Sequence, residues 1–312
     1  MSRIIVIGGT GHVGSYLVPS LVGEGHDVVS ISRGKGESYS QHAAWNRVEQ
    51  VVADRKAEEE AGTFAGRVAD LKGDIVVDLI AFSLASTRPL VEALRGKVEH
   101  FLHCSTLWVY GPTAAVPAGE DEPMNGYGEY GVDKAEIEKW LTHEARATGF
   151  PATIFRPGHI VGEGWVPITP LANDKPAALS TIARGEEITL PNLGLETIHH
   201  VHAADVAQLI MRAITNRSAA IGETFNAVSD KALNLRGYAT ALFAWFGHED
   251  RIAFLPYEEW MKAQPTPEEA HHSWEHFLAQ LVPVDRESAT QARLRARLHQ
   301  HRGGERVRHL AD

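Results

Sequence analysis

The sequence is poor in cysteine and has no long hydrophobic run. Cys104 is the single cysteine among 312 residues, so no intrachain disulfide can form and no cysteine cluster can bind zinc. No run of about 18 apolar residues is present, and the apolar run IIVIG near the start is too short for the core of a signal peptide. These absences predict a protein of the reducing cytoplasm with no membrane partner.

Basic residues are fewer than acidic residues. Lys and Arg number 30 against 40 Asp and Glu, which gives a formal net charge of -10. A nucleic acid or an anionic membrane therefore gains no overall attraction to the chain. The Arg-rich segment 292–310 reverses the sign locally, and on a predicted helix we interpret it as a solvated face or as a contact with the acidic remainder. We expect no nucleic-acid partner.

The 17 histidines raise the question of a metal site. His200 and His202 share one face of a strand-like segment, but no acidic or cysteine cluster accompanies them in sequence. His272 and His276 have the spacing of a helical metal pair, but the HExxH order is absent and a solvated helix face is the favoured interpretation. We expect no metal.

The first half of the chain alternates short β-branched runs with segments of helical period, which is the pattern of βαβ units. The predicted strands are 3–8, 27–32, 47–53, 74–81, 100–105 and 152–156. The predicted helices are 12–25, 86–96 and 129–149. Because the strands are almost continuously apolar, both faces of their sheet should be covered. The sequence predicts a doubly wound parallel α/β sheet.

The regularity weakens after residue 157, where Gly and Pro punctuate the chain. A strand-like segment at 196–202, a helix at 204–215 and a strand at 223–228 follow. We therefore expect a dinucleotide-binding domain over 1–160 and a smaller C-terminal lobe for the substrate over 161–312. Segments around 195–230 should return to the main domain.

A glycine-rich turn, GGTGHVG, joins the first predicted strand to the first predicted helix. Gly8, Gly11 and Gly14 let the backbone approach a diphosphate closely, and the helix N-terminus presents free N–H groups to it. The alternative is an ordinary tight turn, but the position between strand and helix favours a dinucleotide site. The turn residues expected to bind the cofactor are Gly8, Thr10, Gly11, His12, Val13 and Gly14.

The end of the second predicted strand bears on the choice of cofactor. An acidic residue there binds the ribose 2′-OH of NAD, whereas an arginine accommodates the 2′-phosphate of NADP. Ser32 and Arg33 occupy this place, so we expect NADP in preference to NAD. The alternative is that Arg33 stacks on the adenine.

Tyr130 and Lys134 lie four residues apart in a segment of helical period, so both side chains project from one face. An adjacent ammonium favours the phenolate and is expected to lower the pKa of the tyrosine, which makes the pair a proton-transfer device. Thr106 follows a predicted strand and could hydrogen-bond to a substrate oxygen. The alternative for Tyr130 and Lys134 is an exposed helix pair without chemistry.

The motifs now resemble a known family, the extended short-chain dehydrogenase/reductases of the NAD(P)-dependent epimerase/dehydratase group. They are GGTGHVG, VVADR, DLIA, HCSTLWVYG, YGVDK, FRPG and HHVHAADVA, in order over residues 3–230. The resemblance implies a Rossmann fold, with Tyr130 as the acid/base, Lys134 as its partner and ribose ligand, and Thr106 as the family's Ser/Thr. Further cofactor residues implied are Asp54, Arg55, Leu79, Ile80, Ala81, Pro157 and Ile160.

Two departures from the family pattern narrow the chemistry. Leu107 and Trp108 stand where sugar-nucleotide dehydratases have Asp and Glu, so we do not expect a dehydratase. Ser32 with Arg33 and the sequence VVDLIAFS resemble a branch that includes chloroplast stem-loop-binding relatives. Residues that follow strand ends, where open α/β sheets bind ligands, are our candidates for the substrate pocket: Ser83, Trp108, His159 and Trp165.

Together these features predict an NAD(P)-dependent oxidoreductase or epimerase that transfers hydride to or from a hydroxyl or keto carbon. On the resemblance alone, its small-molecule substrate is a sugar, sugar nucleotide or related polyol. The alternative is a non-catalytic NAD(P)-sensing or RNA-binding protein on the same fold. A homodimer through the predicted helix that bears Tyr130 is common among similar proteins, and we expect one here.

Overall fold

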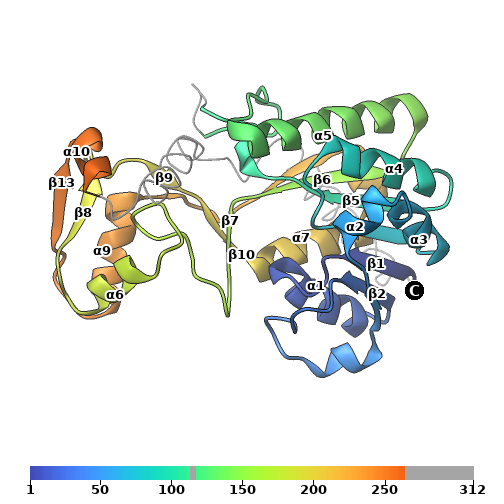
Figure 1. The fold of residues 1–312 in the computed structure, drawn as a ribbon, viewed down its shortest axis with the longest axis horizontal. Helices are drawn as coiled ribbons and strands as arrows, with labels where there is room; N and C mark the ends of the chain where they lie inside the picture. The colour runs from blue at the N-terminus through green and yellow to red at the C-terminus, as the bar shows by residue number, and fades with distance from the viewer. Residues whose placement is uncertain (113–116, 264–312) are drawn as a thin grey trace, which may run out of the picture.

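The computed structural model describes residues 1–112 and 117–263 (Figure 1). Its centre is a sheet of seven strands, all parallel, whose order reverses between β1 and β4. In spatial order the strands are β3 (Glu49–Val52), β2 (Asp27–Ser32), β1 (Arg3–Ile7), β4 (Ile75–Asp78), β5 (His100–Cys104), β6 (Ala152–Pro157) and β11 (Thr224–Ala227). This order confirms the predicted doubly wound α/β fold.

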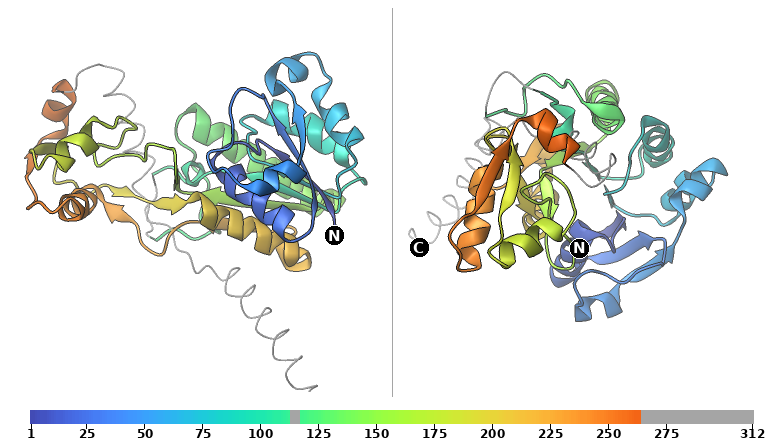
Figure 2. Two further views of the ribbon diagram at one scale, coloured as in Figure 1. Left: turned by 90° about the horizontal axis from the view of Figure 1, so that it is seen from below. Right: turned by 60° about the vertical axis from the view of Figure 1, so that its left-hand side comes forward.

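Helices cover both faces of the sheet (Figure 2). On one face lie α1 (His12–Gly23) and α7 (Ala203–Thr215), and on the other lie α3 (Phe64–Asp70), α4 (Leu84–Leu94) and α5 (Gly128–Thr148). Side chains alternate along each strand, so Ile4 of β1 belongs to the first core and Ile5 to the second. Gly149 ends α5 in the left-handed conformation, at φ +73°, which glycine adopts readily.

The segment between β2 and β4 differs from the prediction in its details. The chain forms a 3-10 turn, η1 (Ala43–Arg47), so the strand expected at 47–53 begins only at Glu49. Two helices, α2 (Arg55–Glu60) and α3, then precede β4 and were not predicted. The sequence of α2, RKAEEE, has no apolar period, and the helix is set by the Asp54 side chain accepting from Ala57 N–H at its N-cap.

A smaller lobe lies to one side of the sheet, at the left of Figure 1. Its elements are α6 (Ala177–Ala183), β8 (Ile188–Pro191), α9 (Leu235–Trp245), β13 (Ile252–Leu255) and α10 (Tyr257–Lys262). β8 and β13 form a parallel pair, and the lobe has a hydrophobic core of its own that includes Phe243 and Trp260, both fully buried. The lobe is therefore built from two separate stretches of sequence.

The two bodies are joined by short strand pairs. β7 (His159–Val161) pairs in parallel with β10 (His200–His202), and β9 (Thr197–Ile198) pairs antiparallel with β12 (Leu233–Asn234). The strand expected at 196–202 is thus divided at His199, whose carbonyl accepts from the N–H of His159 at 2.8 Å. Beyond β10 the chain returns to the main sheet as α7, the short helix α8 (Arg217–Ala220) and β11.

Two further findings concern the described part of the chain. None of its helices has both the length and the apolar character that crossing a bilayer requires. Nor does it hold any group of three or more His, Cys, Asp or Glu side chains placed to bind a metal ion. His272, His276 and the Arg-rich segment 292–310 lie outside the described residues.

Candidate active site

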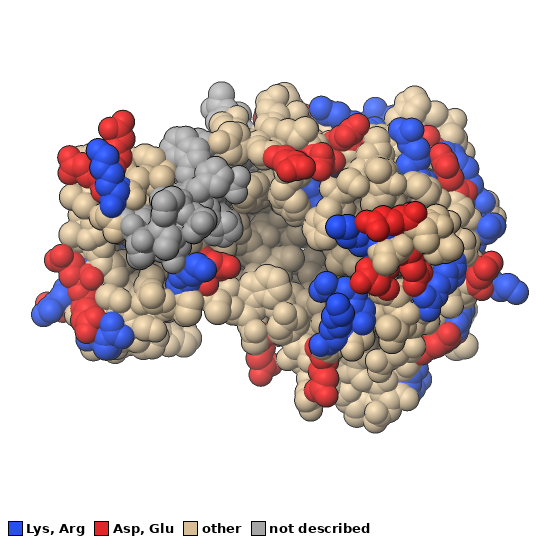
Figure 3. Space-filling view, viewed as in Figure 1, with Lys and Arg blue, Asp and Glu red and all other residues tan. Residues whose placement is uncertain are grey.

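A cavity of about 940 Å³ opens at the carboxyl ends of β1, β4, β5 and β6. It faces the smaller lobe, and the space-filling view shows the surface hollowed between the two bodies (Figure 3). Ligands of open α/β sheets bind at this edge, next to the point where the strand order reverses. The predicted site residues that line it are Gly8, Gly11, His12, Val13, Gly14, Arg33, Leu79, Ile80, Thr106, Trp108, Tyr130, Lys134, Pro157, His159, Ile160 and Trp165.

The glycine-rich turn has the geometry of a phosphate cradle. A Cβ atom on Gly14 would lie 2.2 Å from the carbonyl oxygen of Gly9, and Gly8 adopts φ +89°. Gly11 caps α1 without a side-chain hydrogen bond, so the N–H groups of the first turn have no acceptor from the cap. These residues fit a dinucleotide diphosphate, because free N–H groups and the positive end of the helix dipole meet at an open cavity.

Six predicted site residues do not line the cavity: Thr10, Ser32, Asp54, Arg55, Ala81 and Ser83. Several of them have local structural roles instead. The hydroxyl of Ser32 accepts from Gly34 N–H at 3.3 Å, and Ser83 caps α4 by accepting from Ser86 N–H. Asp54 caps α2 in the same way.

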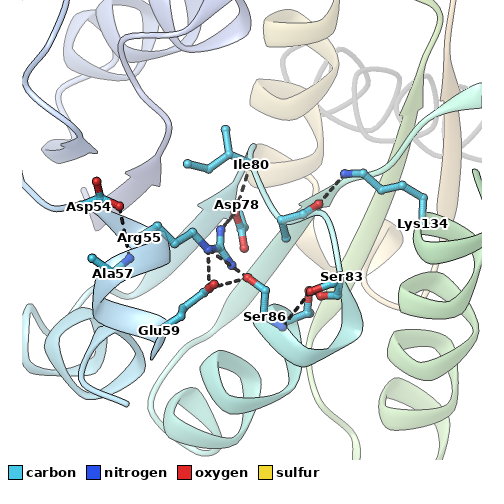
Figure 4. A network of polar contacts seen from close by, with 11 residues as sticks. Asp54, Arg55, Ala57, Glu59, Asp78, Ile80, Ser83, Ser86 and Lys134 are labelled. Atoms are coloured by element: carbon cyan, nitrogen blue, oxygen red, sulfur yellow. Dashed lines mark hydrogen bonds and ion pairs between the residues drawn. The ribbon is translucent and has the colours of Figure 1, made fainter. Parts of the chain in front are cut away.

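Arg55 belongs to a polar network at the end of β4 (Figure 4). Its guanidinium donates to Asp78 at 2.7 Å and to Glu59 at 2.6 Å, and Ser86 donates to Glu59. Burial alone would raise the pKa of Asp78, but the charge and hydrogen bond of Arg55, with smaller contributions from His103 and Ile80 N–H, together hold this pKa below its ordinary value. Since Asp78 also accepts from Ile80 N–H, the network fixes the start of the segment that lines the cavity.

Lys134 links the ends of two neighbouring strands. Its ammonium donates to the carbonyl of Ala81 at 2.6 Å and to that of Cys104 at 2.8 Å, and only 1% of the residue is exposed. Burial lowers the pKa of Lys134. Its Nζ lies 5.8 Å from the centre of the Tyr130 ring. Ala81 therefore contributes to the site through its carbonyl oxygen, although it does not line the cavity.

Tyr130 and Thr106 meet in the cavity. Tyr130 is 40% exposed, and its side chain and that of Thr106 line the same cavity. Thr106 is 6% exposed and also accepts from Trp108 N–H at 3.3 Å. The spacing thus brings the predicted hydroxyl pair together with Lys134 beside the glycine-rich turn.

The acidity of Tyr130 differs from the prediction. We expected the ammonium of Lys134 to lower the pKa of this phenol, but burial raises it to about 12. The Thr106 side chain acts in the opposite direction and lowers this pKa, but by less than burial raises it. Lys134 makes no hydrogen bond to the phenol, because its ammonium donates to the two strand-end carbonyls, and the burial of the phenol determines the direction of the pKa shift.

Arg156 and Glu138 form a buried ion pair next to the segment that carries Thr106. The guanidinium of Arg156 binds the Glu138 carboxylate with contacts of 2.6 and 3.0 Å, and it also donates to the Tyr110 hydroxyl at 2.6 Å. Ser105, the neighbour of Thr106, donates to Glu138. Both residues line the cavity, but the Ser105 hydroxyl is bonded to Glu138, which leaves Thr106 as the one of the two whose hydroxyl makes no bond to the ion pair.

Several residues that line the cavity were missed from the sequence. They include Tyr39, Phe82, Cys104 and His199. Cys104 and His199 lie within motifs quoted for the family, so their neighbours could have pointed to them. Tyr39 lies in a polar loop with no periodic signal, and only the tertiary fold brings it to the cavity.

Comparison with known proteins decides the family. The model of the NAD dependent epimerase/dehydratase family matches residues 4–227. The chain belongs to this family. As the motifs predicted, this epimerase/dehydratase family member is one of the extended short-chain dehydrogenase/reductases. The matched range begins within β1 and ends with β11, so it includes residues of all seven strands of the sheet.

Individual relatives of this family member differ in their named activities. The chloroplast stem-loop binding protein of 41 kDa b of Arabidopsis thaliana is 28% identical over 77% of the chain and 62% of its own length. The 2′-dehydrokanamycin reductase of Streptomyces kanamyceticus is 27% identical over 69% of the chain and 58% of its own length. The chain therefore spans about three fifths of the length of these curated relatives.

Solved structures support the fold. A UDP-glucose 4-epimerase of Thermotoga maritima, crystallised with UDP-glucose, superposes with a TM-score of 0.64 at 21% identity. The match covers 81% of this chain and 85% of the other. At this level of identity the likeness establishes the architecture of the family member.

Proposed function

We propose that the protein is an NAD(P)-dependent oxidoreductase or epimerase acting on a hydroxyl or keto carbon of a sugar, sugar nucleotide or related polyol. One observation carries the proposal: the hydroxyl side chains of Thr106 and Tyr130 share a cavity with a glycine cradle suited to a dinucleotide. A positioned hydroxyl pair beside a hydride carrier is what carbinol–carbonyl interconversion requires.

In this mechanism the bound dinucleotide supplies hydride exchange at its nicotinamide. Thr106 orients the substrate oxygen, and Tyr130 takes up or returns the proton of that oxygen. A raised pKa keeps Tyr130 protonated at neutral pH, which suits it to donate a proton to a carbonyl oxygen. Lys134 holds the ends of β4 and β5 together and so fixes the segment that carries Thr106.

The substrate class rests on the relatives and on the lining of the cavity. By their names, one relative acts on 2′-dehydrokanamycin and several act on UDP-glucose, a sugar nucleotide. Trp108, His159 and Trp165 line the same cavity. Aromatic faces and polar rings suit a polyhydroxylated ring, which presents C–H faces and hydroxyl edges.

We propose NADP as the preferred cofactor, with NAD as the alternative within this NAD-dependent family. β2 ends in Ser32 without a carboxylate, and Arg33 is exposed and lines the cavity. Within the described residues its guanidinium has no ion-pair partner.

Replacing Arg33 with Gln should weaken NADPH binding by roughly tenfold or more, as expected for a lost contact to a charged group, and leave NADH affinity unchanged. Fluorescence titration checks this, and equal losses for both cofactors would contradict it.

A second candidate function is the binding of an RNA stem-loop, because one relative is named for it. The acidic net charge of -10 disfavours it, since affinity for RNA depends on neutralising phosphates. A filter-binding assay at physiological salt distinguishes the two functions. Retention of a stem-loop RNA that survives this salt would favour the second candidate.

The substitution Tyr130→Phe tests the enzyme directly. It removes the hydroxyl but keeps the ring, so cofactor affinity should stay nearly unchanged while turnover falls by about two to four orders of magnitude. Tyr16→Phe is the control, because Tyr16 does not line the cavity. The substrate for this assay is identified beforehand by screening sugars, nucleotide sugars and small polyols for reduction of NAD or NADP by the wild type. Equal turnover of Tyr130→Phe and the control would remove Tyr130 from the mechanism.

We also propose a homodimer through α4 and α5. These helices lie side by side on the outer face of the main domain, and Val132 of α5 is 52% exposed. Light scattering should then give twice the 34.2 kDa of one chain. A mass of one chain at micromolar concentration would contradict the dimer.

A further inference from the structure

His12 is the first residue of α1 and lies inside the cavity, next to the glycine cradle. The residue is 6% exposed, and neither of its ring nitrogens has a hydrogen-bond partner. Of the described residues that line the cavity, His12 alone has buried side-chain nitrogens without a hydrogen-bond partner. A buried polar group without a partner costs stability, so its presence at a ligand site calls for a partner from the ligand.

The imidazole is held in place by two other aromatic rings. The Tyr39 ring packs edge-on against the imidazole with ring centroids 4.3 Å apart, and the Trp165 indole also contacts it. Tyr39 belongs to the loop after β2, and Trp165 to the loop after β7. Gly164 makes this approach possible, since a Cβ atom there would lie 3.0 Å from the Tyr39 ring. Three distant segments thus fix the orientation of the imidazole.

The chemistry at this position favours an anion. The N-terminus of α1 points its free N–H groups and its positive dipole end into the cavity beside His12. Burial lowers the pKa of His12 to about 4, so the ring is neutral at pH 7 and one nitrogen carries a proton to donate. A neutral donor suits this place, because a phosphate oxygen accepts hydrogen bonds strongly.

We propose that the His12 side chain donates a hydrogen bond to the diphosphate of the bound dinucleotide. Its side chain would then add to the backbone N–H groups as a cofactor-binding element, with Tyr39 and Trp165 as the residues that position it. This inference rests on the proposed function, because it takes the cavity to be a dinucleotide site.

The test measures binding of ADP-ribose, which carries the diphosphate but no nicotinamide and needs no turnover. Isothermal titration calorimetry at pH 7 compares the wild type with His12→Gln and His12→Met, two side chains of nearly equal length of which only Gln has an N–H donor. We expect His12→Met to weaken binding by roughly tenfold or more and His12→Gln to retain much of the affinity. His12→Phe, which keeps an aromatic ring, should resemble His12→Met.

His143→Phe is the matched control, because His143 is exposed on α5 and does not line the cavity. It should bind ADP-ribose like the wild type. Equal affinity of the Gln, Met and Phe variants and the wild type would overturn the role of His12 while leaving the cofactor site intact. Failure of the wild type itself to bind ADP-ribose would instead overturn the proposed function. Thermal melts of each variant confirm that the compared proteins are folded.

Discussion

The buried ion pair between Glu138 and Arg156 offers a sharp test of how the site is supported. Replacing Glu138 with Gln keeps the shape of the side chain but leaves the guanidinium of Arg156 buried and uncompensated. Burial alone would lower the pKa of Arg156, yet the Glu138 charge and hydrogen bonds raise it above its ordinary value. A guanidinium is too basic to lose its proton in a protein, so Arg156 stays charged in the variant while its desolvation is no longer offset.

The magnitude follows from the burial of both partners, since Glu138 is 0% exposed and Arg156 is 4% exposed. Breaking such a pair costs about 3–5 kcal/mol. Arg156 keeps its bonds to the Tyr110 hydroxyl and the Glu120 carbonyl, which places the expected loss near the lower end, about 3 kcal/mol. At about 2–4 °C for each kcal/mol, the melting temperature should fall by roughly 6–12 °C.

The assay is thermal unfolding followed by circular dichroism at pH 7. Glu136→Gln is the control, because Glu136 is exposed on the same helix and the same chemical change there should leave the melting temperature within about 2 °C. A double variant, Glu138→Gln with Arg156→Met, should recover part of the loss, since no unpaired charge remains. A melting temperature of Glu138→Gln equal to that of the control would refute the reasoning.

Two further predictions concern the cradle and the pH dependence. Gly14→Ala should lower the melting temperature and abolish ADP-ribose binding, because its Cβ would lie 2.2 Å from Gly9 O. The control is Gly23→Ala in the same helix, whose Cβ meets nothing within 4 Å and which should be neutral or stabilising. Equal melting temperatures of the two variants would contradict this prediction. Burial lowers the pKa of His103 to about 3 from its ordinary 6.5, so the unfolded chain binds more protons between these values and stability falls as pH drops below about 6.5. His103→Leu should flatten this slope by up to about 1.4 kcal/mol per pH unit in denaturant titrations, and an unchanged slope would refute it.

The sequence was enough to predict those features that have a local signal. Alternating apolar strands and helical periods predicted the parallel sheet, and the GGTGHVG turn predicted where α1 begins. The spacing of Tyr130 and Lys134 placed both on α5 at the cavity. Each of these depends on residues close together in the chain, where periodicity and turn chemistry act directly.

Features that depend on contacts between distant segments could not be predicted from the sequence. The polar helix α2 has no apolar period, and Arg55 turns inward because Asp78 lies 23 positions away in sequence but within hydrogen-bond distance. The raised pKa of Tyr130 depends on burial by segments that are distant in the sequence. The lobe was expected only in outline, since β8 and β13 pair across more than 50 residues of intervening chain, Ile188 with Ile252.

The return of the chain from the lobe to the sheet limits how the protein can be divided. α7 packs against α1, and β11 pairs with β6, although both follow the lobe's first stretch in sequence. A truncated chain ending at residue 160 would leave the apolar side of α1 uncovered and the backbone of β6 as an open edge, which invites aggregation. A single cut in the gene therefore separates neither body, and exchanging the substrate lobe between relatives requires at least three junctions, one at each end of its first stretch and one before its second.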